Sequence, residues 1–288
     1  MGIGEIGELL RRSTVQIHGM SRRRPSAGSG VIRDRDGLIV TNAHVLGPEA
    51  HRVELWDGQS FPAEVKERDD HRDLATLKVG ARGLAAARFR SSAVSPGELV
   101  IAVGNPLGFT GALSTGVVHA VGPVPGFGRR PWVQAAVRLA PGNSGGPLAD
   151  ASGEVVGINT MIVSGIVTSG LALAVPSAAI DEFLQRGPHP LIGIAIRPVR
   201  LNRRRGVGLL IMSVEPGGAA EQASLLIGDV LVGTAESPFA SPADLSDAIA
   251  DASAGRLKLR FLRGDQPRER EVVLSLAART AEAARGAA

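Results

Sequence analysis

The chain has 288 residues, of which 44% are hydrophobic and 21% charged, and its formal net charge at pH 7 is +4. This length predicts two domains, and the composition is that of a globular protein with a sizeable core. The chain contains no cysteine, which excludes disulfides, thiol catalysis and cysteine-ligated zinc. No apolar run is long enough for a membrane-spanning helix, so no membrane span is expected.

The positive charge comes mostly from arginine, which clusters at residues 22–24, 129–130 and 203–205. A basic surface binds phosphates non-specifically, so a DNA-associated or membrane-surface role is one hypothesis, based on charge alone. Only 3% of the residues are aromatic and no nucleic-acid-binding motif is present, which favours solvated surface charge and no specific nucleic-acid partner. The chain also lacks the common metal-binding and phosphate-binding motifs, so we expect no cofactor and no metal.

Residues 1–10 contain neither a basic segment nor a continuous apolar segment. We therefore expect no signal peptide. A complete chain would then be cytoplasmic, whereas a chain trimmed at its start would be periplasmic or otherwise extracytoplasmic.

Short runs rich in β-branched residues, separated by Gly, Pro and Asp-Gly turns, recur over the first half of the chain. Many short strands with closely spaced turns predict a mostly β fold, a barrel or a sandwich. The expected strands are residues 14–17, 30–32, 38–41, 52–55, 74–79, 99–103, 116–121 and 154–158.

Two of these strands carry candidate catalytic residues at their ends. His44 follows the strand 38–41, where a buried strand gives way to a loop, so its ring would be held in place yet accessible as a general base. Asp73 directly precedes the strand 74–79, where its carboxylate could orient an imidazole. Asp70 and His71 are nearby competitors for this role.

Ser144 lies in the segment Pro-Gly-Asn-Ser-Gly-Gly-Pro at residues 141–147. Glycines let the backbone turn tightly and bring N–H groups close to a ligand. The backbone amides of Gly142 and Ser144 would form an oxyanion hole, and His44 would supply the base that a serine nucleophile needs. The alternative is a structural turn, because Gly, Asn and Ser are also common in turns.

Residues 142–146 also fit the Gly-x-Ser-x-Gly pattern of α/β-hydrolases. That pattern requires a helix directly after the serine and a histidine well downstream. Here Gly146-Pro147 and a predicted strand follow, and the later histidine, His189, lies in a proline-flanked linker. The order His, Asp, Ser therefore favours Ser144 as a nucleophile with His44 upstream as its base, and not the α/β-hydrolase arrangement.

Beyond Pro176, residues 177–185 predict a helix, because Ile180, Phe183 and Leu184 fall on one apolar face. Gly187-Pro188-His189-Pro190 ends it and predicts an interdomain linker. The expected organisation is thus a first domain at 1–186, a linker at 187–190, a second domain at 191–277 and a flexible tail at 278–288.

Six short motifs surround the candidate catalytic residues or lie between them. They are residues 28–32 (Gly-Ser-Gly-Val-Ile), 41–45 (Thr-Asn-Ala-His-Val), 73–78 (Asp-Leu-Ala-Thr-Leu-Lys), 104–108 (Gly-Asn-Pro-Leu-Gly), 141–148 (Pro-Gly-Asn-Ser-Gly-Gly-Pro-Leu) and 157–160 (Gly-Ile-Asn-Thr). In these motifs and in their order, the chain resembles the HtrA/Deg branch of the trypsin-like (chymotrypsin-fold) serine proteases. The resemblance implies two six-stranded antiparallel β-barrels, the first carrying His44 and Asp73 and the second Ser144, followed by a small α+β domain.

The second domain contains residues 191–196 (Leu-Ile-Gly-Ile-Ala-Ile), 208–214 (Gly-Leu-Leu-Ile-Met-Ser-Val), 217–220 (Gly-Gly-Ala-Ala) and 225–231 (Leu-Leu-Ile-Gly-Asp-Val-Leu). In these segments it resembles a PDZ domain of the HtrA type, which a helix at 243–250 and two closing strands would complete. PDZ domains bind an extended peptide by strand addition and hold its C-terminal carboxylate with backbone N–H groups. By the resemblance, Leu191, Ile192, Gly193 and Ile194 would form the carboxylate-binding loop. Pro198 is expected to interrupt the strand that receives the peptide.

The resemblance implies a serine endopeptidase that cleaves unfolded or damaged proteins and forms a homo-oligomer, by default a trimer. Leu139, Thr160, Met161 and Ile162 are expected to line the substrate pocket, and their aliphatic character predicts cleavage after small or medium apolar residues. Family members carry an acidic residue eight positions before the nucleophile, where this chain has Ala136. That departure supports the alternative of a proteolytically silent chaperone or adaptor that binds exposed peptide segments.

Overall fold

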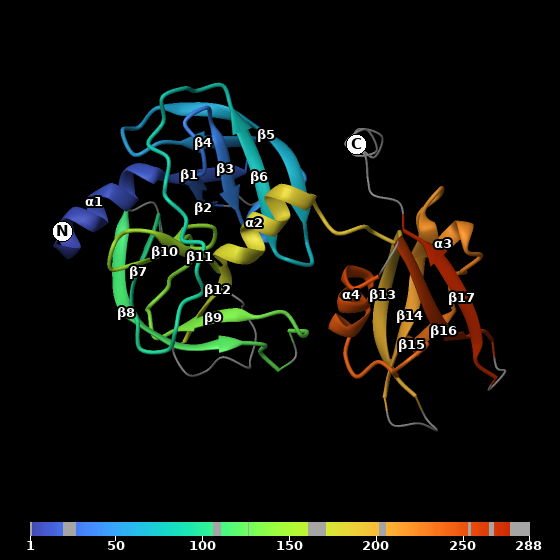
Figure 1. The fold of residues 1–288 in the computed structure, drawn as a ribbon. Helices are drawn as coiled ribbons and strands as arrows, with labels where there is room; N and C mark the ends of the chain where they lie inside the picture. Colours follow the sequence, from blue (N-terminus) through green and yellow to red (C-terminus); the bar gives the residue numbers. More distant parts are fainter. Residues whose placement is uncertain are drawn as a thin grey trace. The chain divides into compact units, whose positions relative to one another are not determined.

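The computed structural model describes residues 2–19, 27–105, 111–125, 127–160, 171–201, 206–252, 255–264 and 268–276. The chain divides into two compact units (Figure 1). The first comprises Met1–Gly122 and Pro131–Pro188, and the second comprises Pro123–Arg130 and His189–Ala288. The fold is mostly β, as expected.

The first unit contains two closed antiparallel barrels, which confirms the predicted two-barrel architecture. The first barrel has the strand order β1-β2-β3-β6-β5-β4. Its strands are β1 (Thr14–Gly19), β2 (Ala27–Ile32), β3 (Leu38–Thr41), β4 (His51–Glu54), β5 (Ser60–Asp69) and β6 (Leu74–Val79). Alternate side chains point inward and form a buried aliphatic core that includes Ile17, Ile39 and Leu77.

The second barrel has the strand order β10-β11-β12-β9-β8-β7. Its strands are β7 (Leu99–Gly104), β8 (Ala112–Gly122), β9 (Trp132–Ala135), β10 (Pro147–Asp150), β11 (Val155–Thr160) and β12 (Ala172–Pro176). Val100, Leu148 and Val156 lie in its core. Closing each sheet on itself leaves no unpaired edge strand in either barrel.

Four of these strands, β5, β9, β10 and β12, were not among the strands expected from the sequence. In β5, Phe61, Ala63 and Val65 alternate with other residues, but Pro62 interrupts this pattern and half of the strand's residues are charged. β10 is only four residues long, which is too short to mark a strand in a sequence. Their pairing with neighbouring strands, which is a tertiary effect, makes them part of the barrels.

The first unit also contains the helix α1 (Ile3–Ser13), which the sequence analysis did not predict. Glycines at positions 4 and 7 lower its intrinsic helix propensity. Ile6 and Leu10 are buried, and a Cβ atom at Gly7 would lie 2.6 Å from the Cδ1 atom of Leu113. Packing against the second barrel therefore stabilises this helix.

Helix α2 (Ser177–Arg186) follows the second barrel and matches the predicted helix closely. Ile180 and Phe183 are fully buried. The guanidinium of Arg72, from the first barrel, lies 3.3 Å from a carboxylate oxygen of Glu182. The helix ends at Gly187, whose φ of +75° is in the region that favours glycine.

The second unit contains a five-stranded antiparallel sheet in the order β13-β14-β15-β16-β17. Its strands are β13 (Ile194–Arg200), β14 (Val207–Val214), β15 (Val230–Thr234), β16 (Arg256–Leu262) and β17 (Arg270–Ser275), with helices α3 (Ala219–Gln222) and α4 (Ala243–Ala250). Its own core includes Leu209, Phe239 and Leu259. The short segment Pro123–Arg130 belongs to this unit, where the Arg129 backbone N–H donates to Asp247 Oδ2 at 2.8 Å.

Pro198 does not interrupt its strand, contrary to expectation. β13 runs through this position, and Pro198 is paired with Leu209 of β14. Because β13 is an edge strand of the sheet, a residue without an N–H group is tolerated there.

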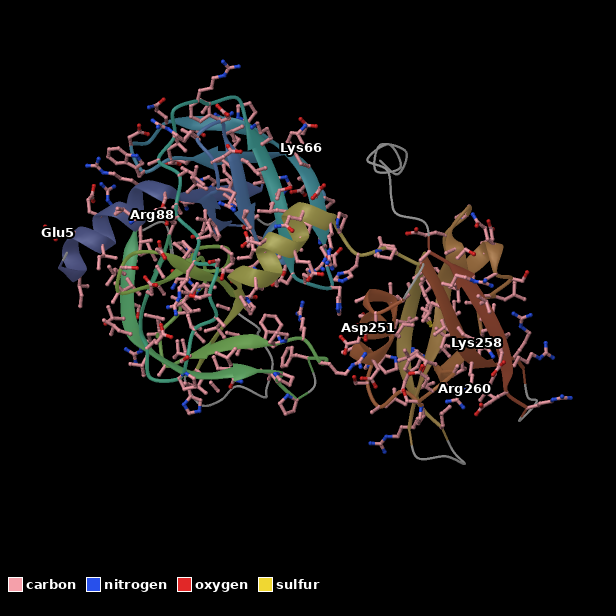
Figure 2. All side chains as sticks on the ribbon, viewed as in Figure 1. Glu5, Lys66, Arg88, Asp251, Lys258 and Arg260 are labelled. Carbon is pink, nitrogen blue, oxygen red and sulfur yellow. The ribbon has the colours of Figure 1, made fainter. Side chains whose placement is uncertain are left out.

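Charged side chains lie on the outside of both units, as Figure 2 shows for Lys66 and Lys258. Several of the basic groups are paired with carboxylates: Lys66 with Glu64, Lys258 with Glu271 and Arg260 with Glu269. Among the described residues, no helix is long and apolar enough to span a bilayer.

The free energy of unfolding should depend on pH through His51, a 4% exposed residue of β4. Burial lowers the pKa of His51, Arg68 lowers it further and Glu49 opposes the shift. Below the ordinary value of about 6.5, the unfolded chain therefore binds this proton more readily than the folded chain. We expect stability to fall as the pH drops from about 6.5 towards 5, and to fall less in the variant His51→Leu. Denaturant unfolding at several pH values would measure this, and equal pH dependence in both proteins would contradict it.

Candidate functional site

His44 and Asp73 lie in direct contact in the first barrel. His44 is in the short 3₁₀ turn η1 (Ala43–Val45) that follows β3, and its Nδ1 atom is 2.9 Å from both carboxylate oxygens of Asp73. The His44 backbone N–H also donates to Asp73 Oδ1 at 3.1 Å. The imidazole is 45% exposed and the carboxylate 16% exposed. This geometry fixes the ring through Nδ1 and directs Nε2 away from the carboxylate.

The turn before β6 holds Asp73 in an unusual backbone conformation. Its φ is +54°, which is uncommon for a residue other than glycine. The Asn42 side-chain amide donates to the Asp73 carbonyl oxygen at 2.9 Å. One residue earlier, Arg72 forms a buried ion pair with Asp69 at 3.0 Å. These contacts stabilise a strained conformation that directs the carboxylate at His44.

Thr160 reaches the same carboxylate from the second barrel. It ends β11, is 1% exposed, and its hydroxyl donates to Asp73 Oδ2 at 2.7 Å. Sequence reasoning assigned Thr160 to the substrate pocket and missed this contact. The two residues are 87 positions apart, and nothing in the local sequence pattern reveals such a pair.

The contact leads to a prediction for the variant Thr160→Val, which removes the hydroxyl and keeps the shape. A hydrogen bond to a charged group contributes roughly 1.5 to 3 kcal/mol. We expect kcat for a peptide substrate to fall about tenfold with little change in KM, because Thr160 acts behind Asp73. A change in KM or in the preferred cleavage residue, with kcat unchanged, would instead support the pocket role.

Ser144 lies on a tightly turned loop of the second barrel and is 6% exposed. The loop begins with a β-turn in which the Asn143 N–H donates to the Ala140 carbonyl oxygen at 3.0 Å. Pro141 and Gly142 occupy its central positions, and Gly142 has a φ of +104°, as a type II turn requires. In the described parts of the chain, the Gly142 N–H donates to no backbone carbonyl group, so the backbone does not occupy this candidate oxyanion donor.

Gly145 shows why the serine is flanked by glycine. Its φ is +87°, and a Cβ atom there would lie 1.9 Å from the Ser29 carbonyl oxygen. The Gly145 N–H donates to the Asn159 carbonyl oxygen at 2.9 Å, and the Ser29 N–H donates to the Ser144 carbonyl oxygen at 2.8 Å. The Ser144 loop is therefore packed directly against strands of both barrels.

The chain after Ser144 is extended rather than helical. Gly146 leads into β10 (Pro147–Asp150). The strand-turn-helix geometry of an α/β-hydrolase nucleophile is therefore absent here, and the Gly-x-Ser-x-Gly match has no structural counterpart. Among the described residues, no group of three or more His, Asp and Glu side chains is arranged to hold a metal ion.

Of the other three predicted pocket residues, the structure describes one, Leu139. Leu139 is half-buried and packs against the core of the second barrel. Met161 and Ile162 lie outside the described residues.

The expected carboxylate-binding loop precedes β13 in the second unit. Leu191 is 54% exposed, whereas Ile192 is buried in the core. Gly193 has a φ of +74°, and its carbonyl oxygen accepts from the Glu215 N–H at 2.8 Å. Ile194 begins the edge strand β13. The loop is thus anchored through its carbonyl groups beside an edge that can accept another strand.

Comparison with family models matches both parts of the chain. Residues 28–158 match the trypsin-like peptidase domain, and residues 190–274 match the PDZ domain.

Curated relatives extend this likeness over most of the chain. HhoA of Synechocystis sp., which is named as a serine protease, is 35% identical over 91% of this chain and 72% of its own length. A protein of Brucella suis, named as a probable periplasmic DegP-like serine endoprotease, is 35% identical over 81% of this chain. The chain spans about half of that longer protein, 49%.

Solved structures share the fold. The HtrA-type protease AlgW with a decapeptide is similar with a TM-score of 0.64 and 23% identity, covering 97% of this chain and 99% of that one. A serine endoprotease from Yersinia pestis has a TM-score of 0.64 and 25% identity, covering 96% of this chain and 97% of that one. Together with the identity to HhoA and the two matched domains, these results show that the chain belongs to the HtrA/DegP family of trypsin-like serine proteases with a PDZ domain.

Proposed function

We propose that this protein is a serine endopeptidase in which Ser144 is the nucleophile, His44 the general base and Asp73 the orienting carboxylate. The observation that carries the proposal is the contact of His44 Nδ1 with both Asp73 oxygens at 2.9 Å. A carboxylate in this position selects the tautomer whose Nε2 can accept a proton, and it stabilises the imidazolium that then forms.

The reaction begins when the Ser144 hydroxyl attacks a peptide carbonyl carbon and transfers its proton to His44 Nε2. The carbonyl oxygen becomes negatively charged in the tetrahedral intermediate. The backbone N–H groups of Gly142 and Ser144 are the proposed donors to that oxygen, and preorganised donors of this kind commonly supply the largest stabilisation. His44 then protonates the leaving amine, and water, activated by the same base, hydrolyses the acyl-enzyme.

The proposed substrates are unfolded or damaged proteins, cleaved after small or medium apolar residues. Leu139 provides aliphatic surface close to Ser144 in sequence, which supports this preference. The edge strand β13 supports binding of an extended segment by strand addition. Both features require accessible, extended chain, which a folded protein does not offer.

A fluorophosphonate probe tests the proposal directly, because it reacts with an activated serine and leaves ordinary serines unmodified. We expect mass spectrometry to find the label on the peptide containing Ser144 in the wild-type protein, and no label in the variant His44→Ala. Label on another serine would contradict the assignment. No label under any condition, including added unfolded protein, would favour the silent chaperone or adaptor suggested by Ala136.

A further inference from the structure

The Gly-Ser-Gly segment at residues 28–30 contributes no nucleophile, base or oxyanion donor to the proposed mechanism. It lies in β2 of the first barrel, and Ser29 is 0% exposed. A buried hydroxyl in a strand usually costs stability unless both its donor and its acceptor capacity are used. The Ser29 hydroxyl uses both capacities, because it donates one hydrogen bond and accepts another.

The Ser29 hydroxyl joins two loops of the second barrel. It donates to the Gly142 carbonyl oxygen at 2.7 Å and accepts from the Asn105 N–H at 2.9 Å. The Ser29 backbone N–H donates to the Ser144 carbonyl oxygen at 2.8 Å. Ser29 therefore binds both residues whose N–H groups are the proposed oxyanion donors, although it is 113 positions from Gly142.

The neighbouring glycines allow β2 to occupy this position. A Cβ atom at Gly28 would lie 2.5 Å from the Cγ1 atom of Val45, the residue after His44. A Cβ atom at Gly30 would lie 2.8 Å from Ile39 in β3. Gly28 thus lets the strand pack closely against the turn that carries His44, and Gly30 lets it pack closely against β3.

These contacts restrict the backbone at Gly142. Glycine has wide conformational freedom, so its amide direction must be determined by its surroundings. The Ser29 hydroxyl and the Ala140 carbonyl oxygen both bind the peptide plane between Gly142 and Asn143, the first through the Gly142 carbonyl oxygen and the second through the Asn143 N–H. This holds one of the two peptide planes that meet at the Gly142 Cα atom. The Gly142 N–H belongs to the preceding plane, so with the following plane held, its direction depends on the φ of Gly142, which is +104° in this turn.

We propose that Ser29 is a positioning residue for the oxyanion hole, through its hydroxyl bond to the Gly142 carbonyl oxygen. The proposal rests on the proposed function of Ser144 and goes beyond it. It makes the oxyanion hole dependent on both barrels: the second supplies the donors, and the first holds them in place beside the strand and turn that carry the base. Removing the hydroxyl leaves the Gly142 carbonyl and the Asn105 N–H without this partner.

The test compares Ser29→Ala with the wild type and with a matched control. Misplacing catalytic groups by about 1 Å can cost about 10²-fold, so we expect kcat and the rate of Ser144 labelling to fall between about tenfold and a hundredfold. KM should change by less than about threefold, because the oxyanion donors act on the transition state. Ser29→Cys, which keeps a weak donor, should give intermediate rates. The control is Ser13→Ala, which removes a buried hydroxyl bonded to the Leu10 carbonyl oxygen in α1 at 3.0 Å, and it should react at the wild-type rate.

The outcomes separate the two proposals. Wild-type rates in Ser29→Ala, a loss confined to KM, or an equal loss in Ser13→Ala would overturn the role of Ser29 while leaving Ser144 as the nucleophile. Failure of the wild-type protein to label at Ser144 would overturn the proposed function and this inference with it. If thermal melting shows that Ser29→Ala is unfolded, Ser29→Cys decides: a reduced labelling rate supports the role and a wild-type rate refutes it.

Discussion

Replacing Ser144 with alanine should abolish casein degradation and lower kcat for a peptide substrate by about 10⁶-fold. No other hydroxyl is proposed as the nucleophile, so the residual rate would come from transition-state binding without a covalent step. The substitution removes one atom from a 6% exposed side chain, and we expect the melting temperature to stay close to that of the wild type. Initial rates with a chromogenic peptide, together with a casein gel assay, measure the effect.

Binding of unfolded casein by Ser144→Ala is the control, because it shows that the variant is folded and has lost only its catalytic step. Ser144→Ala should still bind unfolded casein, because the PDZ-like edge strand β13 is untouched. Hydrolysis at an undiminished rate would remove Ser144 from the mechanism. Equal, very low activity in the wild type and the variant would instead support a chaperone or adaptor role.

Replacing Asp73 with asparagine should lower kcat by about 10⁴-fold, the size of effect known for this substitution in the same constellation of groups. An amide NH₂ placed against His44 Nδ1 favours the tautomer with the proton on Nε2, which cannot accept the serine proton. His44 Nδ1 lies 2.9 Å from both carboxylate oxygens, so the NH₂ group of asparagine faces Nδ1 in either orientation of the amide. The oxygen that remains accepts from another donor, the His44 backbone N–H at the Oδ1 position or the Thr160 hydroxyl at the Oδ2 position. Steady-state kinetics and labelling of Ser144 would both report the loss.

Asp70→Asn is the matched control for this prediction. Asp70 was a sequence-level competitor for the same role, but its carboxylate is exposed and pairs with the Arg68 guanidinium at 2.7 Å. Exposed pairs of this kind contribute little to stability. We therefore expect Asp70→Asn to keep the wild-type kcat. A large loss of kcat in Asp70→Asn, with none in Asp73→Asn, would instead make Asp70 the orienting carboxylate.

The strand alternation and the motifs at strand ends were visible in the sequence because their causes are local. Leu38–Thr41 and Leu74–Val79 have the same bounds in the structure as in the sequence analysis. The helix Ala243–Ala250, expected from the resemblance to a PDZ domain, also has the same bounds in the structure. Alternation and turn residues act within a few positions, so a single chain segment is enough to reveal them.

Elements that depend on partners were not visible. β5 pairs with β4 and β6 although half of its residues are charged, most are exposed and Pro62 interrupts its apolar alternation. α1 is stabilised by packing on the second barrel despite its glycines. In both cases tertiary contacts outweigh intrinsic propensity, and those contacts come from residues distant in the chain.

The sequence by itself determined the mostly β fold class and the candidates His44, Asp73 and Ser144, because strand alternation is local and catalytic chemistry requires particular residue types at strand ends and tight turns. The two-barrel plan came from the resemblance to the HtrA/Deg proteases. Only the tertiary structure decided which residues support these candidates. The bonds from Thr160 to Asp73 and from Ser29 to Gly142 join residues 87 and 113 positions apart. Such bonds depend on barrel closure and strand register, where a shift of one residue turns every side chain to the opposite face. No local sequence pattern specifies that register, so Thr160 and Ser29 can be assigned their supporting roles only from the structure of the closed barrels.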